Sequence, residues 1–111
     1  MSITTHVLDT ARGRPAAGLA VTLSHRGRNG AWSAVGKGVT DDDGRVADLT
    51  SGRVEVGDYR LDFATGAYFK SAGTKTFYPE VSVVFTLDDP GARHHVPLLL
   101  SPFGYSTYRG T

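Results

Sequence analysis

The sequence predicts an all-β protein, an antiparallel β-sandwich with one short helix. Fourteen glycines and five prolines divide its 111 residues into short segments. Most of these segments alternate apolar and polar residues, which is the period of a half-buried strand, and only one stretch has the composition of a helix. About eight short strands at fairly regular spacing favour a sandwich over a barrel or an α/β fold.

Two segments near the start of the chain have the strand period. Residues 3–9 and 18–26 both alternate, and residues 11–18 between them are expected to form a loop. Successive side chains of a strand point to opposite faces, so one face of each strand is expected to be buried. These two faces carry Ile3, Thr5 and Val7 in the first strand and Leu19, Val21 and Leu23 in the second.

The middle of the chain is rich in glycine. Residues 28–32 are expected to turn into a third strand at 31–40, which its glycines weaken. The sequence DDDGR at 41–45 has the Asp-Gly signal of a tight turn, and a short strand follows at 45–49. A calcium loop needs acidic ligands at alternating positions and a later glutamate, whereas these acids are consecutive, so the motif is interpreted as a turn.

The second half of the chain contains the remaining elements. Residues 58–65 alternate, 66–73 are the only plausible helix, and 81–87 are rich in β-branched residues and are expected to form the best-buried strand. Residues 94–101 and 104–110 are expected to form a hairpin around the turn sequence SPFG. The apolar face of the strand at 58–65 carries Tyr59, Leu61 and Phe63.

Length and composition set limits on the kind of protein. A chain of 111 residues predicts one domain, 1–111, with a core that needs no cross-links. Twelve basic and eleven acidic residues, without a long run of either sign, do not indicate a nucleic-acid or membrane partner. Because there is no cysteine, no basic apolar leader and no apolar stretch of about 20 residues, the expected location is the cytoplasm.

Histidines are the first candidates for chemistry, because their unperturbed pKa lies nearest neutrality. His25 ends a strand beside arginines and is interpreted as a solvated strand end. His94 and His95 are neighbours on a strand and must face opposite ways. Both faces of this strand are otherwise apolar, which predicts that the core covers one and another subunit covers the other. The alternation of side chains along the strand leaves open whether His95 belongs to a site or is a core histidine.

Two further features strengthen His95 as a site residue. His6 lies in the middle of its strand, off the face that is expected to be buried. Antiparallel pairing in the last hairpin is expected to bring the segment 108–110 back alongside His95. A phenol and a guanidinium beside an imidazole would suit an anionic, planar, hydrogen-bonding ligand. The alternative is that Tyr108 and Arg109 only complete an edge strand.

Other kinds of site are disfavoured. A zinc site built from His6, His94 and His95 would need the last two to converge, and no carboxylate has ligand spacing with them. The chain has no glycine-rich phosphate loop. None of its serines has the strand-turn-helix context of a hydrolase nucleophile.

Long stretches of the chain resemble the 5-hydroxyisourate hydrolase family, the transthyretin-related enzymes of purine catabolism. The resemblance extends from Ile3 to Thr111. Its motifs are ITTHVLDTARGRPAAGLAVTL, DDDGR, GDYRLDF, FYPEV and HHVPLLLSPFGYSTYRGT. The last of these motifs is the most specific.

The resemblance implies roles for particular residues. The histidine of Thr-His-Val-Leu-Asp matches His6, the arginine of Asp-Gly-Arg matches Arg45, and the histidine before Val-Pro-Leu-Leu-Leu matches His95. These three would be catalytic, and His6 and Arg45 would also bind substrate. The family's final Tyr-Arg-Gly-Ser would add substrate-binding residues, which are Tyr108, Arg109, Gly110 and Thr111. Thr111 is a departure, because the family usually has serine there.

The resemblance also implies a fold, an assembly and a reaction. The fold would be a transthyretin-like sandwich of two four-stranded sheets, assembled as a homotetramer with sites where two dimers meet across a channel. The reaction would be hydrolysis of the small molecule 5-hydroxyisourate, with no metal or organic cofactor. A transthyretin-like carrier of thyroid-hormone type is the alternative, and a noncatalytic interaction module is a third. A polar channel would favour the enzyme, because a carrier of an apolar aromatic ligand needs a mostly apolar one.

Overall fold

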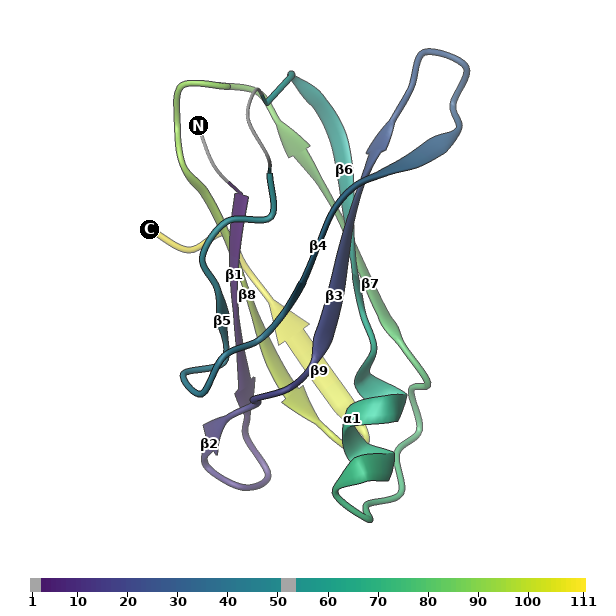
Figure 1. The fold of residues 1–111 in the computed structure, drawn as a ribbon, viewed down its shortest axis with the longest axis vertical. Helices are drawn as coiled ribbons and strands as arrows, with labels where there is room; N and C mark the ends of the chain where they lie inside the picture. Colours follow the sequence, from purple (N-terminus) through teal and green to yellow (C-terminus); the bar gives the residue numbers. More distant parts are fainter. Residues whose placement is uncertain (1–2, 51–53) are drawn as a thin grey trace.

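Two β-sheets pack face to face in the computed structural model, which describes residues 3–50 and 54–111 (Figure 1). The first sheet has the order β2-β1-β8-β9, with β5 also paired to β1, and the second sheet has the order β4-β3-β6-β7. The strands of the first sheet are β1 (Ile3–Asp9), β2 (Arg14–Pro15), β5 (Arg45–Val46), β8 (His94–Ser101) and β9 (Gly104–Thr107). Those of the second are β3 (Ala20–Arg26), β4 (Trp32–Val39), β6 (Gly57–Phe63) and β7 (Val81–Leu87). The predicted sandwich is confirmed.

The first sheet differs from the prediction in two respects. β1 pairs with β8 in parallel, with Thr4 opposite His95 and Val7 opposite Leu98, whereas all pairs were expected to be antiparallel. It also gains β2 from a segment predicted to be a loop, and its β5 has two residues where five were expected. Alternation shows which residues share a face, but it does not show the direction of the partner strand.

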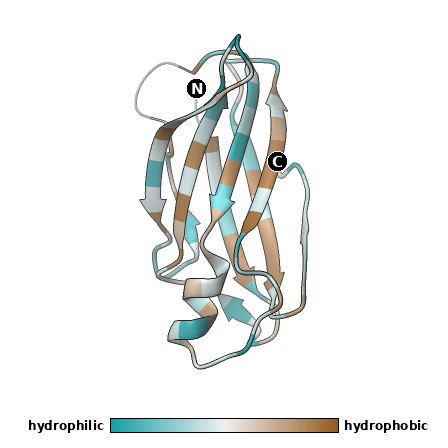
Figure 2. Ribbon diagram, turned by 90° about the vertical axis from the view of Figure 1, so that its right-hand side faces the viewer, coloured by the Kyte–Doolittle hydropathy of each residue, from teal (hydrophilic) through white to brown (hydrophobic). Residues whose placement is uncertain are grey.

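The core lies between the two sheets, where their alternating apolar residues meet. The strand faces predicted from residues 3–9, 18–26 and 58–65 are all buried. Figure 2 shows the same pattern as alternating hydrophobic and hydrophilic bands along the strands. Full burial of each large aliphatic or aromatic side chain stabilises the fold by about 1.5–3 kcal/mol. The period-2 prediction is therefore confirmed for these three strands.

The prediction that residues 81–87 form the best-buried strand is wrong. β7 is an edge strand with β6 as its only partner in the second sheet, and only Val81 and Leu87 at its ends are buried. Val84 is 54% exposed. The β-branched composition of this segment reports strand propensity, and burial depends on what covers each face.

Two glycines in β4 allow the chain that follows it to pass closely across the strand. A Cβ at Gly36 would clash with the main-chain carbonyl of Leu49, and one at Gly38 would lie 2.7 Å from Cγ1 of Val46. Leu49 in turn donates its main-chain N–H to the carbonyl of Ile3 over 3.1 Å. The segment 45–49 is thus held between β4 and β1, which fixes the position of β5 beside β1.

The helix α1 (Thr65–Ser71) overlaps the stretch 66–73 predicted to be helical and ties the two sheets together at one end of the sandwich. The Tyr68 hydroxyl donates a 2.7 Å hydrogen bond to Oδ2 of Asp9, a carboxylate that is 1% exposed. Burial, followed by the nearby Asp9, raises the pKa of the Tyr68 phenol. Across the described ranges 3–50 and 54–111, no helix is long and apolar enough to span a membrane.

Replacing Tyr68 with phenylalanine is expected to lower the free energy of unfolding by about 2 kcal/mol, the usual value for a hydrogen bond to a charged group. The loss would leave an oxygen of the buried Asp9 without its donor. Urea unfolding followed by the fluorescence of Trp32, the only tryptophan, measures the change. Tyr78→Phe is the matched control, because Tyr78 also packs against the core and its hydroxyl donates no hydrogen bond within the described part of the chain. Equal losses in the two variants would contradict a specific role for the Asp9 bond.

Candidate active site

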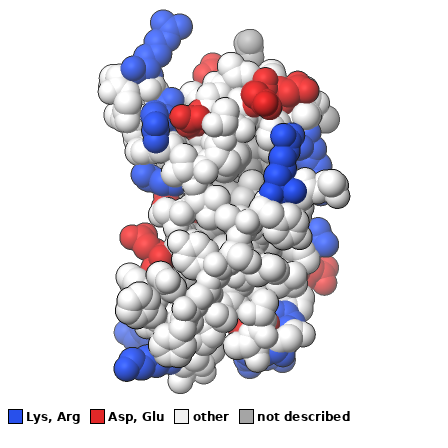
Figure 3. All heavy atoms as spheres, turned by 180° about the vertical axis from the view of Figure 1, so that it is seen from behind, with Lys and Arg blue, Asp and Glu red and all other residues white. Residues whose placement is uncertain are grey.

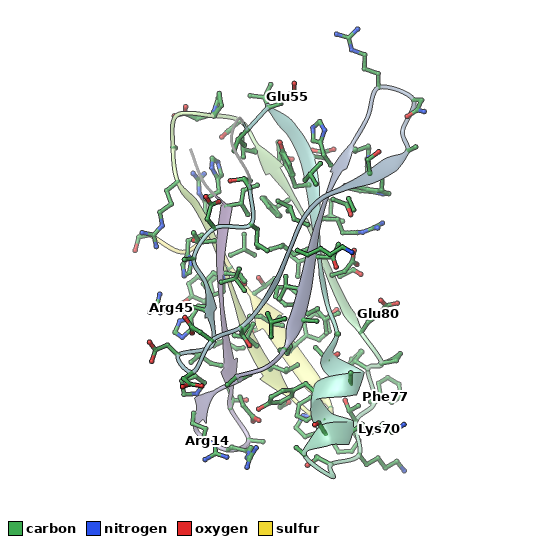
Figure 4. The ribbon with its side chains drawn as sticks, viewed as in Figure 1. Arg14, Arg45, Glu55, Lys70, Phe77 and Glu80 are labelled. Atoms are coloured by element: carbon green, nitrogen blue, oxygen red, sulfur yellow. The ribbon has the colours of Figure 1, made fainter. Side chains whose placement is uncertain are left out.

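Three of the residues predicted to form a site lie together on the outer face of the first sheet. His6 on β1 is paired with Arg45 on β5. His95 on β8 is paired with Thr4, two residues before His6 on the same face of β1. Figure 4 shows Arg45 on the side of the molecule away from the second sheet. Residues that are 91 positions apart in the chain thus meet at one surface.

The two adjacent histidines have the opposite orientations that their spacing requires. His94 is 2% exposed and faces the core, where its Nδ1 lies 3.2 Å from the carbonyl oxygen of Ala92. His95 is half-buried on the other face, and its Nδ1 is bonded to a side chain, Thr4, rather than to the backbone. His95 is therefore not a core histidine bonded to the backbone, and its role in a site stays a prediction.

The Asp-Gly turn positions Arg45. The Oδ1 atom of Asp41 accepts the main-chain N–H groups of Asp43 and Arg45, over 2.9 and 3.0 Å. Gly44 has φ +75°, which favours glycine, and its carbonyl accepts the N–H of Val7 over 2.7 Å. The acidic motif therefore acts as a turn that fastens β5 to β1, as predicted.

A pocket of about 310 Å³ opens beside His95. Its charged and titratable lining residues are Asp41, Arg45, Arg93 and His95. Arg93 and Thr4, which also lines the pocket, were not identified from the sequence. The signal for Arg93 was available, because a residue two positions before His95 on an extended chain faces the same side.

The environment of His95 disfavours its protonated form. Burial is the main cause that lowers the pKa of the imidazole, and electrostatic interactions with Arg93, Arg45 and His6 lower it further. At neutral pH the ring is therefore neutral and can accept a proton. A neutral imidazole beside two guanidinium groups can activate water next to a bound anion.

The end of the chain returns to His95, as the hairpin prediction required. Gly110 forms an isolated bridge with His95 and donates its N–H to the His95 carbonyl over 2.8 Å. Tyr108, Arg109 and Thr111 are exposed, and the described residues that line the pocket do not include them. Within one chain, the structure brings only Gly110 of the final four residues against the histidine.

The interpretation of His25 as a solvated strand end is wrong. Its ring is half-buried in the second sheet, with its centroid 4.6 Å from that of Tyr59. Its Nε2 is buried and has no hydrogen-bond partner among residues 3–50 and 54–111. Strand ends are usually exposed, but here Gly57, which has no side chain, lets the ring lie against its backbone.

The fold and the pocket define a transthyretin-like sandwich that carries histidine and arginine side chains on the outer face of one sheet. The model of the HIUase/Transthyretin family matches residues 3–110, and the chain belongs to this family. The resemblance seen in the sequence is therefore confirmed.

Relatives and solved structures agree with this assignment. The chain is 46% identical to a 5-hydroxyisourate hydrolase of Mus musculus over 111 residues, which cover 98% of this chain and 94% of the mouse protein. The structure of Klebsiella pneumoniae 5-hydroxyisourate hydrolase superposes with a TM-score of 0.88 at 34% identity, covering all of both chains. Sea bream transthyretin in complex with thyroxine superposes with a TM-score of 0.94 at 32% identity, covering 100% of this chain and 96% of the other. The prediction of an enzyme is confirmed by the hydrolase relatives.

Proposed function

We propose that this protein hydrolyses 5-hydroxyisourate to 2-oxo-4-hydroxy-4-carboxy-5-ureidoimidazoline, a step of urate degradation, as a single cytoplasmic domain spanning residues 1–111. The observation that carries the proposal is the position of His95, which lines a pocket together with Arg45 and Arg93. The hydrolase relatives supply the substrate class.

Ring opening by hydrolysis makes three demands on the site. A water molecule must lose a proton as its oxygen bonds to the carbonyl carbon, the carbonyl oxygen must hold negative charge, and the departing ring nitrogen must gain a proton. The His6–His95 pair meets the first and last demands, and such acid–base catalysis contributes about 10²–10⁴-fold. Arg45 binds the electron-rich substrate and stabilises the developing charge.

The final residues complete the substrate-binding wall in this proposal. Tyr108 and Thr111 offer hydroxyl groups to the substrate, while Arg109 and Gly110 shape the wall. Gly110 lies against His95, which supports this placement. Thr111 keeps the hydroxyl of the serine usual in the family, so its extra methyl group is expected to alter fit and not the reaction. Neither a metal nor an organic cofactor takes part.

A homotetramer, formed as a dimer of dimers, accounts for two surfaces of the chain. β7 and β9 end their sheets on the same edge of the sandwich, and an unpaired strand edge is a surface that pairs with another chain. Figure 3 shows this side, where a broad uncharged region lies between charged ends. Exposed apolar side chains of the edge include Val84 and Tyr105. The outer face that carries the pocket would then meet its counterpart across a channel, and light scattering on the purified protein measures the assembly.

A carrier of thyroid-hormone type is the second candidate, because the sea bream structure with thyroxine has the same fold. The side chains around the pocket argue against it. Asp41, Arg45, Arg93 and His95 place charged and titratable groups around it, whereas a thyroid hormone is a largely apolar aromatic ligand. The hydrolase is therefore preferred.

The deciding assay follows 5-hydroxyisourate generated in situ from urate by urate oxidase. Addition of the purified protein is expected to speed the decay of the ultraviolet signal in proportion to protein concentration. Decay at the spontaneous rate in the presence of folded, assembled protein would contradict the hydrolase. Titration with thyroxine would then test the carrier.

The rate is expected to depend on pH through His95. The neutral ring is the form that accepts a proton, so kcat/KM falls as the pH falls through the pKa of His95, which is lowered from 6.5. The acid limb of the pH profile is expected below pH 6.5. Arg93→Gln removes a positive charge and is expected to move the limb to higher pH. If kcat/KM falls at the same pH in Arg93→Gln as in the wild type, a group other than His95 controls the rate.

A further inference from the structure

Thr4 makes a short, specific contact with His95. Its hydroxyl Oγ1 lies 2.7 Å from Nδ1 of the imidazole, and Thr4 is only 8% exposed. The two residues are directly opposite in the parallel pairing of β1 and β8, so the ladder itself holds them together. Within the described part of the chain, this is the only hydrogen bond that the His95 ring makes.

The remaining edges of the ring are also accounted for. A Cβ built on Gly110 would lie 2.5 Å from Cδ2 and 3.2 Å from Cγ of His95, so the tail backbone closes that edge. Thr4 occupies the Nδ1 side. Both Thr4 and His95 line the pocket, so the remaining edge of the ring, which carries Nε2, is expected to face it.

The charges around the pocket determine how the proton is placed on the neutral ring. The groups that face His95 are Arg93 immediately before β8, His6 on β1, and Arg45 with Asp41 around β5. The positive charges favour a lone pair pointing toward them and disfavour an N–H there. The proton of the neutral ring is therefore expected on Nδ1, where a hydroxyl oxygen can accept it.

We propose that Thr4 is a positioning residue for His95. Its hydroxyl oxygen accepts a hydrogen bond from Nδ1–H and holds the ring with an unprotonated Nε2 facing the pocket. This inference rests on the proposed hydrolase function for its catalytic meaning. An acceptor at Nδ1 fixes both the tautomer and the ring angle, as the orienting partner of a catalytic histidine does in other enzymes. Thr4 would act on the reaction only through His95.

Nuclear magnetic resonance of the ¹⁵N-labelled protein tests the tautomer without any substrate. The wild-type spectrum above the pKa of His95 is expected to show the proton on Nδ1. Thr4→Val keeps the side-chain shape and removes the acceptor, so the charged ring loses a stabilising partner and the pKa of His95 is expected to fall. A proton on Nε2, or a pKa that rises in Thr4→Val, would overturn the proposal, because either result means that the hydroxyl donates to the ring.

Kinetics supply the second readout. Thr4→Val is expected to lower kcat about tenfold with little change in KM, the size of one lost hydrogen bond in the transition state. Thr4→Ser keeps the hydroxyl and is expected to restore both the rate and the pKa. Thr10→Val is the matched control, because the Thr10 hydroxyl donates to the Leu100 carbonyl at the other end of the same strand pairing and Thr10 does not line the pocket. Unchanged kcat in Thr4→Val, or an equal loss in Thr10→Val, would refute the positioning role. If the wild-type protein does not hydrolyse 5-hydroxyisourate, the spectra still decide what Thr4 does.

Discussion

Replacing His95 with glutamine is expected to lower kcat for 5-hydroxyisourate by about 10²–10⁴-fold, the usual contribution of a positioned acid–base group. Glutamine fills a similar volume and can keep a hydrogen bond with Thr4, which is 2.7 Å from the imidazole in the wild type. It has no nitrogen that can take up a proton near neutral pH. The fold is expected to persist, because the outward-facing side chain of His95 is not part of the core. Stopped-flow absorbance with substrate generated in situ measures the loss.

His25→Gln is the control for this substitution. His25 is also half-buried on a strand, but it belongs to the second sheet and contacts Tyr59 instead of the pocket. Its replacement is expected to affect stability more than turnover per folded molecule. Full activity in His95→Gln, or a comparable loss in His25→Gln, would mean that the proposed site is misplaced.

Replacing Gly110 with alanine is expected to lower turnover by at least tenfold, and up to about 10²-fold, because a displacement of about 1 Å at a reacting group can cost that much. The added Cβ would lie 2.5 Å from Cδ2 of His95 and 3.2 Å from Cγ of Pro97, too close for either to stay in place. The tail or the imidazole must therefore move. Circular dichroism and the same kinetic assay separate a local displacement from unfolding.

Gly104→Ala provides the comparison within the same hairpin. A Cβ at Gly104 would meet only Oγ of Ser101 at 3.7 Å, an ordinary contact, and its backbone has no positive φ. This variant is expected to keep nearly full turnover. If Gly110→Ala keeps the turnover of the wild type, the close approach of the tail to His95 is not required for activity.

The sequence predicted the strand faces well, because alternation directly reports which side chains share a side. Ile3, Thr5 and Val7 are buried as expected, and the hairpin does return Gly110 to His95. The grouping of His6 with His95 was suggested by the position of His6 off the buried face and by the resemblance. It depends on the parallel pairing of two strands from opposite ends of the chain, and no local pattern encodes such a partner.

The misses have physical causes as well. β7 was taken as buried because Val81, Val83 and Val84 favour strands, yet it lies at an edge. Arg93 was missed although its spacing from His95 was visible in the sequence, whereas Thr4 was missed because its contact with His95 exists only in the folded chain. Nothing in the sequence distinguishes Thr4 from any other threonine near the start of a strand. Only the fold shows that its hydroxyl lies 2.7 Å from a histidine nitrogen.

The parallel pairing of β1 with β8 has a consequence for how the protein folds. Thr4 and His95, which line the pocket, are 91 residues apart in the chain. The pocket therefore forms only after the chain has lost the conformational entropy of a long loop. Proteins dominated by such distant pairings fold in milliseconds to seconds, not in microseconds. During synthesis, β1 emerges long before β8. The edge of β1 that pairs with β8 therefore stays unpaired until β8 has been made. Recovery of turnover after dilution from denaturant should consequently follow the formation of this last pairing, later than the collapse of the second sheet.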